Sequence, residues 1–190
     1  MPALQYSAID KAFEYFDYTL KRLVDATSGL TDAQWHFKPS PDRWSIAENI
    51  EHLVLVQDRV LGPVREQIAQ APAPPAGRDE EGVDAIILET IPDRSIRAKA
   101  PEFLDPTRRW TRTEALERIR RNYERLSDWV ESTADLREHW LESAPLRIVT
   151  NGTHAMADGY QWALTLAAHD ERHVRQIEEV KADPKYPLAA

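Results

Sequence analysis

The stretch DGYQWALTLAAHDERHVRQIEEVK, residues 158–181, decides the fold. Its apolar residues recur every three or four positions, the spacing that places them on one face of an α-helix. Pro184 follows and stops such a helix. Two histidines and a glutamine interrupt the apolar stripe, which consists of Trp162, Leu166, His169, His173, Gln176, Ile177 and Val180.

Three further segments have the same periodicity and cover residues 7–27, 45–70 and 111–132. Ser45 with Glu48, and Thr111 with Glu114, have the spacing of capping boxes at helix starts. Pro63 predicts a kink or a break in the second helix. Four helices, each about 30–38 Å long at the standard rise per residue, predict an all-α four-helix bundle.

The long connection between the second and third helices spans residues 71–110 and contains six prolines. Within it, residues 83–91 have the character of a short helix or an ordered packing segment. A connection of this length in a compact domain indicates a crossover or a lid over a site. The chain has no internal repeat or boundary signal, so we expect residues 1–190 to form a single domain.

The composition excludes several classes of function. The net charge of -8 argues against a nucleic-acid-binding protein. No window is apolar over the length of a membrane span, and the N-terminal residues do not resemble a secretory signal, so we expect a cytoplasmic location. The chain has no cysteine, so any metal must be held by His, Asp or Glu.

His169 and His173 lie four residues apart on the buried stripe and therefore project from the same side of the helix. Two stacked imidazoles on an apolar face need partners for four ring nitrogens. A divalent metal would take one nitrogen of each ring, with the other N–H donated to a nearby acceptor. The alternative is that both are core histidines, each satisfied by a neighbouring carbonyl group.

The segment His169–His173 invites comparison with the metalloprotease helix motif, but Asp170 stands where that motif has glutamate. Only seventeen residues follow His173, and none resembles the downstream third ligand of such proteases, so any third ligand should come from upstream. By spacing alone His52, on the second helix, is a plausible but unexceptional candidate. The other histidines fit surface or loop positions and are His36, His139 and His154.

Two groups of motifs resemble the DinB-like superfamily. The first is LTDAQW at 30–35, followed by PSPDRWSIAE at 39–48 and His52; the second is His-x-x-Arg-His-x-x-Gln-Ile at 169–177. The resemblance implies a four-helix bundle with a long crossover between helices two and three. It also implies a divalent metal, most often zinc or nickel, bound by His52, His169 and His173.

Other motif residues have no ligand role in this resemblance. We expect Gln176 to contact one of the metal-ligating residues or to line the pocket. We expect Arg172 to pair with a carboxylate across the bundle, and Trp44 to anchor the start of the second helix. Glu48 could act as a base, although its capping role explains it better.

Members of the superfamily imply two kinds of function. One is a metal-dependent hydrolase, or a transferase that uses a low-molecular-weight thiol, acting on a small molecule through a metal-bound water or thiolate. The other is a non-catalytic, stress-associated protein that binds a metal or a ligand. Dimers are frequent among such proteins, so a homodimer is an open expectation. Fold alone does not decide the reaction.

Overall fold

The computed structural model describes residues 9–97 and 100–188. Its helices are α1 (Ile9–Thr27), α2 (Asp32–His36), α3 (Ile46–Ile68), α4 (Glu80–Thr90), the 3-10 helix η1 (Glu102–Leu104), α5 (Arg112–Ser132), α6 (Ala144–Val149) and α7 (Gly159–Lys181). Two short strands, β1 (Trp140–Glu142) and β2 (Met156–Asp158), pair antiparallel with Trp140 opposite Asp158.

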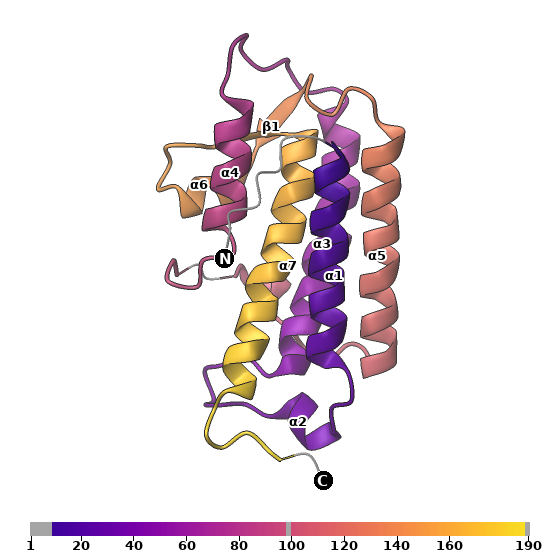
Figure 1. Ribbon diagram of the computed structural model, residues 1–190, viewed down its shortest axis with the longest axis vertical. Helices are drawn as coiled ribbons and strands as arrows, with labels where there is room; N and C mark the ends of the chain where they lie inside the picture. The colour runs from indigo at the N-terminus through magenta and orange to yellow at the C-terminus, as the bar shows by residue number, and fades with distance from the viewer. Residues whose placement is uncertain (1–8, 98–99, 189–190) are drawn as a thin grey trace.

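The four long helices α1, α3, α5 and α7 lie side by side as a bundle (Figure 1). Packing contacts join α1 to α7, α7 to α3, α3 to α5 and α5 to α1, so the helices close a ring around one core. Completely buried apolar side chains from all four helices fill it, among them Phe16, Ile50, Ile119 and Ile177. The predicted all-α bundle is confirmed.

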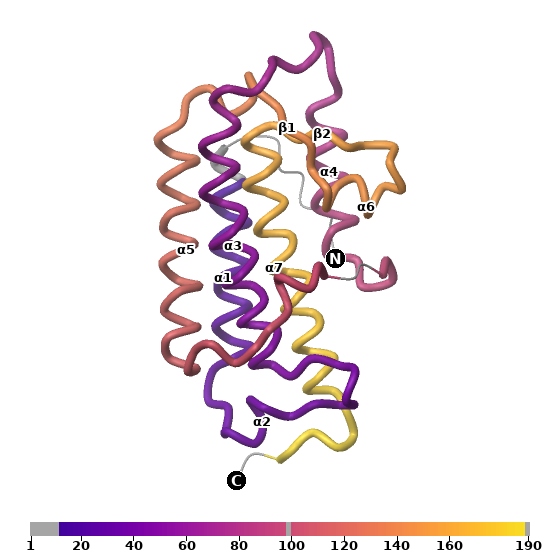
Figure 2. The backbone as a smooth tube through the Cα atoms, turned by 180° about the vertical axis from the view of Figure 1, so that it is seen from behind, coloured from indigo at the N-terminus to yellow at the C-terminus, as the bar shows by residue number. Residues whose placement is uncertain are grey.

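The helix directions explain the long connection. α3 and α5 both run upward in Figure 1, whereas α1 and α7 run downward. Because α3 and α5 are parallel, the chain must travel back along the bundle between them. It does so through α4 and the segment after it, which crosses α7 and α3 before it reaches α5 (Figure 2). The connection is therefore the predicted crossover.

The helix starts agree with the sequence signals. Ser45 and Thr111 each accept the backbone N–H of the glutamate three residues on, and each glutamate side chain accepts the N–H of its cap residue. Asp158 and Gln161 form an equivalent capping box at the start of α7. Residues 7 and 8 of the predicted first helix lie outside the described residues.

Pro63 lies inside α3 and does not interrupt it. α3 is continuous through Pro63 to Ile68, so the predicted break is wrong. Pro63 and Arg59 are both exposed, so water can solvate the Arg59 carbonyl that has lost its helical N–H partner. The cost of the proline is therefore reduced at this position.

Buried ion pairs fix α4 against α7. The Arg137 guanidinium donates to Asp84 of α4 at 2.6 Å and to the capping Asp158 at 3.1 Å. Arg78 also donates to Asp158, at 2.6 Å, and Gln161 donates to Asp84 at 3.0 Å. Breaking one partner of such a buried pair leaves an uncompensated charge, so the network holds this part of the crossover in place.

None of the helices in the described residues combines the length and apolar character needed to cross a membrane.

Candidate metal centre

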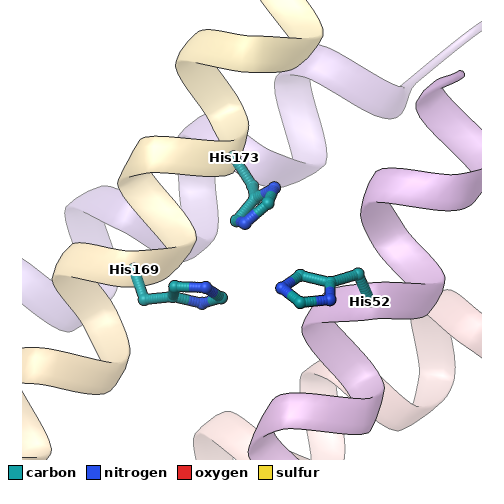
Figure 3. A group of neighbouring side chains, drawn as sticks. All are labelled: His52, His169 and His173. Carbon is teal, nitrogen blue, oxygen red and sulfur yellow. The ribbon is translucent and has the colours of Figure 1, made fainter. Parts of the chain in front are cut away.

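His52, His169 and His173 come together between α3 and α7, with their rings directed toward one another (Figure 3). The ring centroids of His169 and His173 are 4.6 Å apart, and that of His52 lies 4.8 Å from His173 and 5.3 Å from His169. One nitrogen of each ring lies within 4.8 Å of the other two. This three-histidine centre is the one group of the described residues whose imidazole, thiol or carboxylate ligands gather in this way.

His52 is held by a backbone carbonyl from the crossover. Its Nδ1 lies 3.0 Å from the carbonyl oxygen of Leu104, which can only accept a hydrogen bond. Nδ1 therefore carries the proton, and Nε2 is left with its lone pair. The side chain is buried, although the sequence pattern placed it only at the edge of the apolar stripe.

His173 is oriented by a buried asparagine on α3. Its Nδ1 lies 2.8 Å from Oδ1 of Asn49, and Nδ2 of Asn49 donates to the Ser45 carbonyl at 2.8 Å. The second bond fixes which end of the amide faces the ring, so Oδ1 accepts and His173 Nδ1 donates. His173 therefore also presents Nε2 as the free nitrogen.

His169 completes the set without a comparable partner. Its Nδ1 is buried and has no hydrogen bond to any described residue. A buried ring nitrogen with no partner raises the free energy of the fold, and a bound ion or an ordered water would remove that cost. This orphaned nitrogen is the first observation that favours a ligand at the centre.

The surroundings keep the rings neutral. Burial lowers the pKa of His52, and it lowers those of His169 and His173 well below the usual histidine value. For His173 the neighbouring histidines and the positive charges of Arg94 and Arg172 lower the pKa further. Neutral imidazole is the form that binds a metal ion. The residues present thus fit a divalent ion bound by three histidines.

Trp44 forms one wall of the centre. Its ring stacks on His173 with centroids 5.9 Å apart and planes 20° from parallel, and it lies 4.7 Å from the His52 ring. Trp44 directly precedes the Ser45 cap of α3, so the predicted anchoring of the helix start and the contact with two ligands come from one side chain. The contacts of Trp44 with the two histidines have no signal in the sequence pattern.

Arg172 differs from its prediction. Its buried guanidinium donates to the backbone carbonyls of Ile91, Asp93 and Ile96, not to a carboxylate across the bundle. The turn after α4 returns its carbonyl groups toward α7, and a guanidinium with five donors can bind several of them at once. Arg172 therefore fastens the crossover next to His173.

The remaining candidates lie outside this arrangement. Gln176 is half-buried and makes no side-chain hydrogen bond to the described residues, so its contact with a ligand stays a prediction. Glu48 caps α3 and pairs with Lys38, as its capping role predicts. His36 is exposed, and His139 is half-buried, with Nδ1 2.6 Å from the Ala71 carbonyl.

Sequence reasoning missed two groups that hold the ligands. Asn49 was detectable in principle, because a polar residue one turn before His52 on a buried face calls for a partner. The Leu104 carbonyl had no signal, because any residue there offers the same backbone oxygen.

Two cavities in the described part of the chain have volumes of about 280 Å³ and 160 Å³, and none of the three histidines lines either one. The larger lies on the other side of the α3 N-terminus, between Trp35 and Trp110. The centre instead contacts the ring of Trp44 and the backbone carbonyl of Leu104 in the crossover.

A four-helix bundle in which two facing helices supply three histidines defines a class of helical proteins with a potential metal centre. The family model described as the DinB superfamily matches residues 15–177, and the chain belongs to this superfamily. The chain is also similar to the uncharacterized protein YuaE of Bacillus subtilis (strain 168). They are 26% identical over 154 residues, a match that covers 80% of this chain and 86% of that protein. No solved structure matches the chain significantly.

Proposed function

We propose that this protein is a metal-dependent enzyme that acts on a small molecule, either as a hydrolase or as a transferase of a low-molecular-weight thiol. The observation that carries the proposal is the convergence of three neutral imidazoles. Two of them already donate a hydrogen bond from Nδ1–H to a fixed acceptor. This is how metal-ligating histidines are oriented in proteins.

His52, His169 and His173 would hold the ion, and the family resemblance favours zinc or nickel. When bound, such an ion would supply Lewis acidity that lowers the pKa of a water or thiol brought to it. Asn49 and the Leu104 carbonyl would keep two rings in the ligating tautomer. Trp44 would exclude water from one side of the centre.

The second candidate is a non-catalytic protein that binds a metal or a ligand in a stress response. It is favoured by a different observation, namely that the crossover contacts His52 through the Leu104 carbonyl and that no histidine of the centre lines the cavities of about 280 Å³ and 160 Å³. An enzyme needs room for its substrate next to the ion, whereas storage of a metal ion does not.

The test has two stages. Protein purified without a metal-affinity tag is analysed for bound metals, together with His52→Ala and the matched control His139→Ala, whose ring bonds only the Ala71 carbonyl. We expect about one equivalent of metal in the wild type and in the control, and a loss of at least tenfold in affinity in His52→Ala. A wild-type protein that binds neither zinc nor nickel would overturn the proposal.

The second stage separates the two candidates. The metal-loaded protein is screened for amide and ester hydrolysis and for conjugation of small thiols, before and after dialysis against a chelator. Activity that disappears with the metal and returns with it supports the enzyme. Metal binding without turnover in this screen favours the binding protein, and activity that survives complete metal removal contradicts both.

A further inference from the structure

Three arginines gather beside the three-histidine centre. Arg172 directly precedes His173 on α7, Arg94 lies in the turn that Arg172 fastens, and Arg43 directly precedes Trp44, whose ring stacks on His173. They come from three separate segments of the chain: α7, the crossover and the loop before α3. This convergence is notable in a chain whose net charge is -8.

The carboxylates near this cluster do not balance it. Arg94 donates to Glu179 through Nε at 3.1 Å and through Nη2 at 3.3 Å, and Arg43 donates to the same carboxylate at 3.0 Å. Two guanidiniums therefore share one negative charge. Arg172 binds only backbone carbonyls, which carry no formal charge.

Two further carboxylates lie near this cluster. Asp93 is half-buried, accepts hydrogen bonds from the backbone N–H and hydroxyl of Ser95, and together with Glu179 offsets part of the charge of Arg172. Asp105 follows Leu104, whose carbonyl contacts His52. Three guanidiniums thus face the two carboxylates Glu179 and Asp93, which leaves an excess of positive charge.

A metal ion would increase this excess. Three neutral histidines leave the full charge of a divalent ion uncompensated, unlike a set that includes a carboxylate. Anions are the ligands that such a centre attracts, and paired guanidiniums bind the oxygens of a carboxylate or a phosphate with directional hydrogen bonds.

We infer that the small molecule taken by the three-histidine centre carries an oxyanion group, a carboxylate or a phosphate, which binds Arg94 and Arg43 in place of Glu179. The inference rests on the proposed function, since it assumes that the centre receives a ligand. Glu179 is about 40% exposed and Arg94 about 28%, so this part of the cluster is reached from solvent. Glu179 acts as an internal stand-in for the ligand's anionic group.

The experiment follows the arginine Nε–H signals of the full-length, ¹⁵N-labelled protein by NMR, at constant ionic strength, with and without zinc. The probes are inorganic phosphate, acetate and acetamide, the last being the uncharged isostere of acetate. Zinc content is measured on the same samples. We expect phosphate and acetate to shift the Arg94 and Arg43 signals saturably and acetamide to leave them unchanged. The anion that binds more tightly identifies the group.

Two variants test the assignment. Arg94→Gln should weaken binding of the preferred anion about tenfold, the loss expected for one charge-assisted hydrogen-bonding partner. Glu179→Gln should tighten it about threefold, because the competing carboxylate is gone. A purely structural role for Glu179 predicts the opposite, since its removal would loosen both arginines. Arg147→Gln is the matched control, because Arg147 is also paired with an exposed glutamate but lies on α6.

The outcomes separate the two proposals. Zinc binding without a saturable anion shift overturns the oxyanion inference and leaves the metal centre intact. Equal shifts of all arginines, or weaker binding in Glu179→Gln, also overturn it. Absence of both zinc and nickel binding overturns the proposed function, while the metal-free titration still decides whether anions bind this cluster.

Discussion

Nδ1 of His173 donates a hydrogen bond of 2.8 Å to the side-chain oxygen of Asn49, and the two residues belong to the helices that face each other across the centre. Asn49 is completely buried, and its amide nitrogen is bound to the Ser45 carbonyl. The capped first turn of α3 thus determines the tautomer of an imidazole on α7. Asn49 belongs to no candidate ligand set itself, yet its hydrogen bond sets the orientation of the candidate ligand His173.

This relationship predicts the effect of Asn49→Leu. Leucine has a similar volume but no acceptor, so His173 loses the bond that fixes its ring, and zinc affinity should fall about ten- to a hundredfold. Competition with a chromophoric zinc chelator measures this affinity. Asn49→Asp keeps an acceptor at the same position and should bind zinc nearly as tightly as the wild type. Unchanged affinity in Asn49→Leu would show that the asparagine does not position His173.

A second prediction concerns pH. Burial holds the histidine pKa values of the centre below the usual value near 6.5, so the unfolded chain takes up protons first as the pH falls. The stability contributed by the neutral rings is complete above about pH 6.5 and is lost as the pH falls below it. Protons and metal also compete for the same nitrogens.

We therefore expect zinc to raise the melting temperature by about 5 °C or more at pH 7.5 and by less than about 2 °C at pH 5. The difference between scans with and without zinc isolates the centre from the titration of other carboxylates. His36→Ala, at an exposed position, should retain the wild-type pattern. A zinc effect of equal size at both pH values would contradict the role of the three rings.

The periodic stripe of residues 158–181 was enough to predict α7, because a long amphipathic helix with a stop signal leaves few alternatives. The placement of His169 and His173 on one face of α7 followed from the same pattern. His52 did not, because the direction of its side chain depends on how α3 rotates against α7, which no local spacing encodes. The family motif supplied that ligand.

The rest of the site depends on contacts that are distant in the sequence. Leu104 meets His52 over 52 positions, and Asn49 meets His173 over 124. The short elements α2 and α6 were missed because five or six residues contain too little periodicity to be distinguished from a loop. The length of the connection predicted a crossover or a lid, and the family resemblance implied the crossover. Its contact with His52 is made by the Leu104 backbone carbonyl, which has no local sequence signal.

A third prediction concerns Asp170, which follows His169 and is buried between α3 and α5. Burial raises its pKa to about 7, although the nearby Tyr123 hydroxyl and the Gln57 amide, which donates to the carboxylate at 2.5 Å, oppose the rise. Because the folded pKa lies above the ordinary value near 3.8, ionisation destabilises the fold, and this cost grows as the pH rises toward 7.

Asp170→Asn keeps an oxygen for Gln57 and cannot ionise. In zinc-free protein its melting temperature should exceed that of the wild type by about 5 °C at pH 8, and the difference should shrink toward pH 5. Asp128→Asn, an exposed position on α5, should show no such trend. If Asp170→Asn melted lower than the wild type at pH 8, the carboxylate would be a stabilising group and the assignment would be wrong.

The last prediction concerns Glu51, whose buried carboxylate accepts backbone N–H groups from Thr107 at 2.9 Å, Arg108 at 2.7 Å and Arg109 at 3.2 Å. The Glu51→Gln side chain would turn an amide N–H₂ toward some of these donors, so the segment that presents Leu104 to His52 should loosen. We expect the free energy of unfolding in urea to fall by about 2 kcal/mol, a value typical of a hydrogen bond to a charged group. Hydrogen exchange at residues 107–109 should accelerate about tenfold, and zinc affinity should fall with it, because the acceptor of His52 Nδ1 moves.

The control Glu117→Gln changes an exposed glutamate of α5 and should leave stability, hydrogen exchange and zinc affinity unchanged. If Glu51→Gln lowered the stability but left the zinc affinity unaltered, the Glu51 contacts would hold the crossover without influencing the three-histidine centre.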